Sequence, residues 1–271
     1  MGNAYGIDIG TSNFKMCCSD KDKILNEKNI IAIANKTEIL AFGDEAYEMY
    51  EKAPEHIEVS FPVKFGVIAD IENMQTLLFS FFNKINEGKK ITGSDFYIAV
   101  PTDVTEVEKR AFYELVVDSK VKAKNVYVVD KPVADAIGAG LEINKPTGNM
   151  VIDIGGGTTD IAVLSLGDIV TSSSLKIAGD VMDADIIKFV KDKYKLLIGD
   201  RTAEQIKLEI GSAIKGASDK TFEVRGRDLV TGLPHTITIT SNETELALRE
   251  TCATIVKETK HVLEQTPPEL A

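Results

Sequence analysis

The feature that most constrains the fold of this 271-residue chain is an internal repeat. The segment GIDIGTSN, at residues 6–13, recurs in the middle of the chain as VIDIGGGTTD, at residues 151–160. In each copy an apolar run leads into an aspartate, Asp8 or Asp153, and a turn rich in glycine and hydroxyl residues follows. A second apolar segment then leaves each turn. The repeat predicts two related lobes that each bring one hairpin loop to a common cleft.

Both turns have the composition of a phosphate site. Glycine permits positive φ and close approach of the backbone to a ligand, and successive N–H donors form an anion-binding nest. One copy alone fits an ordinary glycine hairpin equally well, but the duplication favours phosphate binding. Because Asp8 and Asp153 precede the turns, they would lie close enough to hold Mg²⁺ through water. The candidate phosphate contacts are Gly10, Thr11, Ser12, Asn13, Gly155, Gly156, Gly157 and Thr158.

The rest of the chain alternates between strand-like and helix-like segments, which is typical of the α/β class. Thr105 and Thr202 each begin a Thr-x-x-Glu/Gln spacing, which predicts a capping box at a helix start. The expected strands lie at residues 5–9, 14–18, 96–100, 126–129, 150–154 and 161–166, with a β insertion over 220–240. The expected helices lie at residues 104–117, 134–141, 181–194, 202–213 and 246–263.

Composition narrows the class of protein. The net charge of −11 argues against a nucleic-acid binder, which needs clustered Lys and Arg. The three cysteines form neither a disulfide framework nor a metal-binding pattern, and no apolar run approaches the ~20 residues that span a bilayer. A soluble protein of the reducing cytoplasm is therefore expected. The P-loop and Rossmann patterns are absent, so the duplicated hairpin is the strong site.

The two motifs resemble those of the actin, sugar-kinase and Hsp-type chaperone ATPases, and most closely those of the bacterial actin family MreB, whose members determine rod shape. The later segments KPVADAIGAG, VRGRDLVTGLP and LEQTPPELA resemble that family more specifically and in the same order. The resemblance implies an actin-like, ribonuclease H-like α/β fold of two lobes, each a mixed sheet flanked by helices. It places the first lobe at residues 1–31 and 75–142, its inserted subdomain at 32–74, the second lobe at 143–179 and 245–271, and its insertion at 180–244.

The resemblance also implies the cofactors, ATP and Mg²⁺, and the roles of individual residues. Asp8 and Asp153 would serve the metal, and Asp153 and Thr158 would act in hydrolysis. Glu204 and Lys207 match the ribose contacts of the family; alone, their spacing favours a solvated i,i+3 ion pair.

One departure from the family concerns hydrolysis. The family has Glu immediately before the Pro of KPVADAIGAG, where it positions the attacking water, and here that residue is Lys131. An ammonium has no lone pair with which to accept a proton. Either Asp135 or Asp130 takes over that role, or the chain binds ATP and hydrolyses it very slowly, and the second outcome is favoured.

Two further departures concern the membrane and the chain end. The family reaches the membrane through an N-terminal amphipathic helix or a hydrophobic loop, but the first strand begins by Tyr5 and the aligned loop, residues 86–93, is mostly polar. Lys89 and Lys90 could touch anionic lipid, although a solvated loop fits better. Residues 267–271 match the start of a helix that a Gly-rich adenine loop follows in the family, so a truncated second lobe is expected.

The function implied by the resemblance is that of a filament-forming bacterial actin that guides cell-wall synthesis, with a slow ATPase coupled to polymerisation. Its partners would be further copies of itself and the cell-wall synthesis and membrane shape proteins, with no nucleic acid and little support for direct membrane binding. A cytoplasmic location, with a peripheral position at the inner membrane face left open, is expected. The alternatives are an actin-fold small-molecule kinase and an Hsp-type chaperone ATPase.

Overall fold

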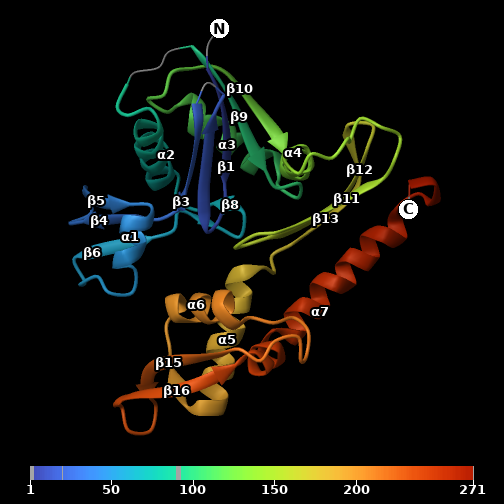
Figure 1. The fold of residues 1–271 in the computed structure, drawn as a ribbon. Helices are drawn as coiled ribbons and strands as arrows, with labels where there is room; N and C mark the ends of the chain where they lie inside the picture. Colours follow the sequence, from blue (N-terminus) through green and yellow to red (C-terminus); the bar gives the residue numbers. More distant parts are fainter. Residues whose placement is uncertain (1–2, 20, 90–92, 271) are drawn as a thin grey trace. The chain divides into compact units, whose positions relative to one another are not determined.

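The computed structural model describes residues 3–19, 21–89 and 93–270, and Figure 1 follows them along the chain. The chain divides into two compact units: the first contains residues 1–176 and 262–271, and the second contains residues 177–261. Strands and helices alternate along the chain, which confirms the predicted α/β class. The finer division into two lobes with inserted subdomains stays a prediction.

The main sheet of the first unit has five strands in the order β10-β9-β1-β2-β3. Strand β1 is antiparallel to β2 and parallel to β9, and β10 continues the parallel half of the sheet. Alternate residues of β1, namely Tyr5, Ile7 and Ile9, are buried because successive side chains of a strand point to opposite faces. The strands are β1 (Ala4–Ile9), β2 (Asn13–Cys18), β3 (Lys21–Lys28), β9 (Ser94–Val100) and β10 (Ala123–Asp130).

Helices α2 (Ile71–Ile85) and α3 (Glu106–Val117) pack on the buried face of this sheet (Figure 1). Phe81 of α2 and Phe112 of α3 lie in the same core cluster as Tyr5. The predicted capping box at the start of α3 is confirmed, because Thr105 and Glu108 exchange hydrogen bonds with each other's backbone.

A small sheet follows β3, with strand order β5-β4-β6. Ala46 of α1 (Asp44–Met49) packs with Ile30 and Ala32 in a separate core. Next comes a short hairpin of β7 (Val63–Lys64) and β8 (Val67–Ile68), whose turn contains Phe65 and Gly66. The strands of the small sheet are β4 (Ile31–Ala34), β5 (Glu38–Phe42) and β6 (Ile57–Ser60).

The second three-stranded sheet of the first unit has β12 (Thr159–Ser165) at its centre, between β11 (Asn149–Ile154) and β13 (Asp168–Leu175). All residues of β12 are buried. Leu164 packs with Ala136 of α4 (Lys131–Gly138) on one face, and Ile161 packs with Val262 near the end of α7 on the other. Burial on both faces explains why this strand reads as a continuous apolar run.

The second unit combines helices with a three-stranded sheet, β14-β15-β16. The β15–β16 hairpin confirms the predicted β insertion, and Ile186 and Val190 lie in the core as the helical stripe of α5 predicts. The capping box predicted at Thr202 is wrong, because α6 begins at Asp200 and Thr202 lies inside its first turn. The elements are α5 (Gly179–Tyr194), β14 (Leu196–Leu197), α6 (Asp200–Ile210), β15 (Thr221–Asp228), β16 (Pro234–Thr240) and α7 (Ser241–Gln265).

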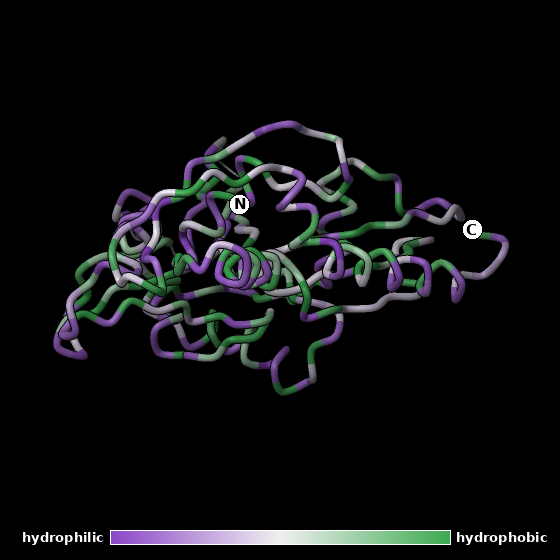
Figure 2. Tube along the Cα trace, turned by 90° about the horizontal axis from the view of Figure 1, so that it is seen from below, coloured by the Kyte–Doolittle hydropathy of each residue, from purple (hydrophilic) through white to green (hydrophobic). Residues whose placement is uncertain are grey.

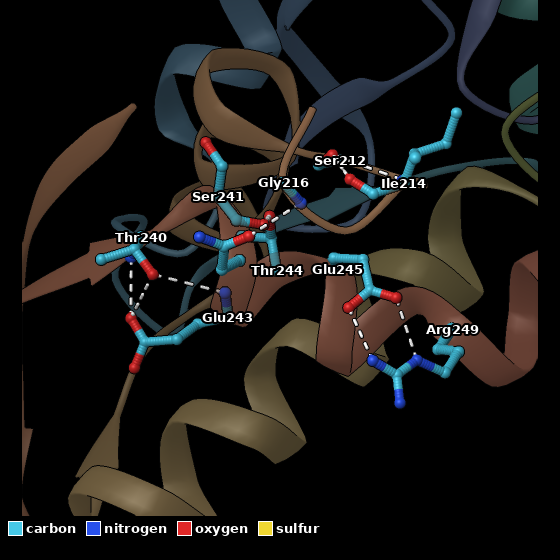
Figure 3. Close-up of polar contacts among 10 residues, drawn as sticks. Ser212, Ile214, Gly216, Thr240, Ser241, Glu243, Thr244, Glu245 and Arg249 are labelled. Atoms are coloured by element: carbon cyan, nitrogen blue, oxygen red, sulfur yellow. Dashed lines mark hydrogen bonds and ion pairs between the residues drawn. The ribbon is translucent and has the colours of Figure 1, made fainter. Parts of the chain in front are cut away.

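The start of α7 is held by a capping box that the sequence analysis missed (Figure 3). The Thr240 backbone N–H donates to Glu243 Oε2 at 2.8 Å, and the Glu243 N–H donates to the Thr240 hydroxyl at 3.3 Å. Lys193 also pairs with Glu243, and although burial opposes the charge, these hydrogen bonds lower the pKa of Glu243 to about 2. The helix therefore begins at Ser241 instead of the predicted residue 246.

Hydropathy along the helices shows a mixed pattern. In Figure 2, hydrophilic and hydrophobic residues alternate along α7, which leads to the C-terminus. Within the described ranges, each helix is too short or too polar to pass through a lipid bilayer. Lys89, one of the two lysines considered for lipid contact, is exposed, and Lys90 lies outside the described residues.

Candidate functional site

The two copies of the repeat fold into hairpins with the same register. In the first loop, residues 10–13, the Gly10 N–H donates to the Asn13 carbonyl at 3.1 Å. In the second loop, residues 155–158, the Gly155 N–H donates to the Thr158 carbonyl at 2.9 Å. Both loops therefore contain four residues between the last paired residues of their strands, Ile9 and Phe14 in one and Ile154 and Thr159 in the other. The sequence repeat is a structural repeat.

The two loops lie against each other within the first unit. A Cβ atom on Gly157 would lie 2.5 Å from Thr11 Oγ1 and 3.0 Å from the Cα atom of Phe65. Such distances are too short for a side chain, so glycine is required here by the close approach of the loops and not by a special φ. The structure thus brings together the loops that the sequence analysis assigned to phosphate.

A turn that the sequence analysis did not identify contacts both loops. The Gly66 N–H donates to the Thr11 hydroxyl oxygen at 3.0 Å. A Cβ atom on Gly66 would lie 2.9 Å from the Thr158 methyl group. Gly66 has φ +78°, which favours glycine in the turn. The β7–β8 hairpin therefore helps to fix the relative positions of Thr11 and Thr158.

The first loop is held by residues at the end of β3. The Asn29 side chain donates to the Gly10 carbonyl at 2.8 Å, and its backbone N–H donates to the Ser12 carbonyl at 2.9 Å. The Lys28 ammonium donates to the Ser12 hydroxyl at 3.3 Å. The loop thus combines backbone donors with a nearby positive charge, an arrangement suited to an anion.

Two aspartates, Asp8 in β1 and Asp160 in β12, each contact a neighbouring side chain. Asp8 pairs with Lys15 at 3.1 Å across the β1–β2 ladder. The Thr158 hydroxyl donates to Asp160 Oδ2 at 3.1 Å, and Asp160 is fully buried. Burial raises the pKa of Asp160. Asp160, which the sequence analysis did not select, thus orients the hydroxyl that it did select.

Lys131 joins the two halves of the repeat. It is the first residue of α4, and its Nζ lies 2.8 Å from Asp153 Oδ2 and 3.8 Å from Asp8 Oδ1. Its side chain is only 14 % exposed. Burial disfavours the charged form, but the carboxylates of Asp8 and Asp153 outweigh burial and raise the pKa of Lys131 above its ordinary value. Lys131 is therefore a fixed positive charge between the two aspartates of the repeat.

The two carboxylates considered as replacements for the family's Glu differ in position. Burial, and then the nearby charge of Asp153, raises the pKa of Asp135 to about 6. Its Oδ2 atom is buried and has no hydrogen-bond partner in the described part of the chain. Asp130 instead pairs with Lys109 of α3 at 3.8 Å. Asp135 thus belongs electrostatically to the cluster around Lys131, whereas Asp130 is engaged by α3.

The predicted metal ligands, Asp8 and Asp153, both face the Lys131 ammonium. Mg²⁺ requires near-octahedral oxygen ligands and keeps several waters, whereas the cation that faces these two carboxylates here is the Lys131 ammonium. Among the residues described, no group of three or more His, Cys, Asp or Glu side chains could hold a metal ion. The residues present do not fit a Mg²⁺ ion between Asp8 and Asp153.

Lys207, predicted as a ribose contact, is engaged within the second unit. Its ammonium lies 2.7 Å from Asp183 Oδ2 and donates to the Gly179 carbonyl at 3.0 Å, so it connects α6 to α5. Burial raises the pKa of Asp183 to about 6, and the ion pair with Lys207 offsets only part of that effect. The sequence does not predict Asp183 as the partner of Lys207. The ribose role of Glu204 and Lys207 stays a prediction.

Sequence comparisons place the chain in a protein family. The model of the family described as MreB/Mbl protein matches residues 2–271. The cell shape-determining protein Mbl of Bacillus subtilis is 48 % identical over 267 residues, which cover 98 % of this chain and 80 % of that protein. The cell shape-determining protein MreB of Escherichia coli K12 is 40 % identical over 275 residues, 99 % of this chain and 79 % of that protein.

Solved structures show the same fold. MreB5 of Spiroplasma citri bound to ADP is 36 % identical with a TM-score of 0.92, over 100 % of this chain and 81 % of that one. The MamK double helical filament is 21 % identical with a TM-score of 0.82, over 99 % of this chain and 82 % of that one, and this likeness concerns the fold alone. The predicted actin-like fold is confirmed. The chain belongs to the MreB/Mbl family of actin homologues.

Proposed function

We propose that this chain is a filament-forming bacterial actin that binds ATP between its two glycine hairpins. The observation that carries this proposal is the structural repeat, in which two loops of the same register lie against each other. The structures of MreB5 from Spiroplasma citri, bound to ADP and to AMPPNP, support a nucleotide as the ligand. The curated relatives are cell shape-determining proteins, which supports the same role for this chain.

The proposed phosphate contacts are the backbone N–H groups and hydroxyls of the two loops, residues 10–13 and 155–158. The ribose would be bound by Glu204 and Lys207, as the family resemblance implies. Mg²⁺ as a partner of ATP also comes from the resemblance, and the Lys131 bridge between Asp8 and Asp153 weighs against the predicted ligands.

Hydrolysis is proposed to be slow. Lys131 stands where the family has Glu, and an ammonium cannot accept a proton from the attacking water. The Thr158 hydroxyl is engaged by Asp160, and Asp130 is paired with Lys109. Asp135 is the remaining carboxylate considered for the water-positioning role, and burial, together with the nearby charge of Asp153, raises its pKa to about 6. ATP binding without efficient turnover would favour long-lived filaments.

Self-association is the proposed consequence of nucleotide binding. The MamK structure is a double helical filament, and this chain shares its fold. Subunits that stack head to tail form a heterologous contact that extends without closing. In the cell, such filaments would lie in the cytoplasm or at the inner membrane face and organise the proteins of cell-wall synthesis.

Negative-stain electron microscopy and pelleting of the purified chain test this proposal. Filaments are expected with ATP or AMPPNP and are expected to be absent without nucleotide. Gly157→Ala is the matched variant, because it disturbs the contact between the loops and leaves the rest of the surface unchanged. Bound ATP without filaments at any protein concentration would contradict the polymerisation part of the proposal, and absence of ATP binding would contradict all of it.

A further inference from the structure

The position of Lys131 has a consequence for the ligand that the phosphate site accepts. In its immediate surroundings lie four carboxylates, those of Asp8, Asp135, Asp153 and Asp160. Lys15 contacts Asp8, and Lys131 contacts both Asp8 and Asp153. A nucleoside triphosphate would add further negative charge to this cluster of carboxylates. A cation between the two loops is therefore needed for binding.

We propose that the Lys131 ammonium is the built-in cation of this site, so that the chain binds nucleoside di- and triphosphates without a divalent metal ion. The inference rests on the nucleotide binding proposed above. The ammonium lies between the aspartates of the two halves of the repeat, so it already supplies a positive charge to both carboxylates.

The site disfavours a second cation beside Lys131. The Lys131 side chain is 14 % exposed, and Lys131 is followed by Pro132, whose ring fixes the backbone at the start of α4. A divalent ion bound by Asp8 and Asp153 would face the ammonium at close range, and like charges repel strongly where water is excluded. Displacing Lys131 from these carboxylates would also leave its own charge unpaired.

Lys131 can also contact a phosphate directly. An ammonium has three N–H donors, and the 2.8 Å contact to Asp153 uses one of them. Lysine binds phosphate as a point charge, so in this proposal the remaining donors serve a phosphate oxygen bound by the loops. The proposed ligand is therefore a nucleoside di- or triphosphate without a bound metal ion.

Calorimetric titration of the full chain with ATP, in excess EDTA and in excess Mg²⁺, tests the inference. The dissociation constant of the unmodified chain is expected to agree within about threefold between the two conditions. For Lys131→Gln, binding in EDTA is expected to weaken by about tenfold or more and to recover with Mg²⁺. Lys131→Arg keeps the charge and is expected to behave like the unmodified chain. Lys124→Gln, at an exposed position of β10, is the control.

A measurement without any variant covers the case in which Lys131→Gln fails to fold. Crystals of the unmodified chain grown with ATP and Mn²⁺ are expected to show no anomalous scattering peak between Asp8 and Asp153. A peak at that position overturns the inference, and so does loss of ATP binding by the unmodified chain in EDTA alone. Metal-independent binding by Lys131→Gln would overturn the assignment to Lys131. Failure to bind ATP in both conditions would instead overturn the proposed function.

Discussion

Asp153 lies directly opposite Asp160 across the β11–β12 ladder, whereas the corresponding residues of the first hairpin are Asp8 and Lys15. The first hairpin thus contains an ion pair at this position, and the second contains two like charges on one face, an arrangement that destabilises a sheet. The Lys131 ammonium, 2.8 Å from Asp153, supplies the missing positive charge. The charge at residue 131 therefore contributes to the stability of the site as well as to its chemistry.

Removal of this charge is expected to destabilise the protein. Lys131→Met leaves Asp153 and Asp160 without a cation, and breaking a buried ion pair costs about 3–5 kcal/mol. Because the side chains of Asp8 and Asp153 remain 22 % and 26 % exposed, we expect a smaller loss, about 1–3 kcal/mol. Urea unfolding followed by circular dichroism measures the change, with Lys124→Met as the control. Equal stability of the two variants would contradict the bridging role.

Asp135 should contribute to the pH dependence of the free energy of unfolding. Burial and Asp153 raise its pKa from the ordinary 3.8 to about 6. The folded protein therefore binds more protons than the unfolded chain between these values, so the free energy of unfolding falls as the pH rises through this window. Asp135→Asn removes that contribution and should show a smaller fall between about pH 4 and about pH 6.

Asp183, with a pKa also near 6, gives the same slope in the unmodified chain and in Asp135→Asn, so the difference between them isolates Asp135. Asp118→Asn, at an exposed position after α3, is the matched control and should reproduce the slope of the unmodified chain. Identical slopes for Asp135→Asn and Asp118→Asn would contradict the raised pKa.

The close approach of the two loops predicts a strong effect of one methyl group. In Gly157→Ala, the new Cβ atom would lie 2.5 Å from Thr11 Oγ1 and 3.0 Å from the Phe65 backbone, so the loops must move apart. We expect a loss of stability of about 1–3 kcal/mol and a clear loss of ATP affinity. Gly138→Ala, at the end of α4 with open space around it, is the control and should leave both properties unchanged.

The slow-hydrolysis proposal predicts a gain of activity on charge reversal. Lys131→Glu supplies a carboxylate that can accept a proton from the attacking water, and a positioned general base contributes about 10²–10⁴-fold to rate. We expect single-turnover ATP hydrolysis in Mg²⁺ to rise by about 10²-fold over the unmodified chain. Lys124→Glu makes the same charge change at an exposed site. Equal hydrolysis rates for the unmodified chain, Lys131→Glu and Lys124→Glu would show that Lys131 is not the cause of slow hydrolysis.

In the second unit, the pair of Lys207 and Asp183 should behave as a structural ion pair. Lys207→Met leaves the Asp183 carboxylate largely buried without its cation, and we expect a loss of about 1–3 kcal/mol in the free energy of unfolding. Lys188→Met, at an exposed position of α5, should have little effect. A Lys207→Met variant as stable as Lys188→Met would show that the pair contributes nothing to the packing of α5 and α6.

The hairpins could be predicted from the sequence because their signals are local. Asp8 and Asp153 precede glycine turns at the ends of apolar strands, and the register follows from the turn. The capping box at Thr240 and Glu243 was also readable, since Thr-x-x-Glu precedes the helix, but it lies at the end of a β-rich segment. Thr202 shows the reverse case. The Thr-x-x-Gln spacing is present, but the helix begins two residues earlier, so Thr202 does not cap it.

The contacts that complete the site could not be predicted in this way. Gly66 reaches Thr11 through a hairpin far along the chain, and Lys131 reaches Asp8 and Asp153 only when two sheets and α4 are assembled. Asp183 meets Lys207 through the packing of two helices. These are tertiary contacts between residues that share no local sequence pattern, so neither motifs nor composition predict them.

The two hairpins of the repeat are proposed to bind the phosphates of a nucleotide. A crystal structure of the chain with AMPPNP tests this most directly. The β- and γ-phosphates are expected between residues 10–13 and 155–158, with the Lys131 ammonium in contact with a phosphate oxygen. Phosphates bound elsewhere, or loops that stay in contact at saturating AMPPNP with no nucleotide between them, would contradict it.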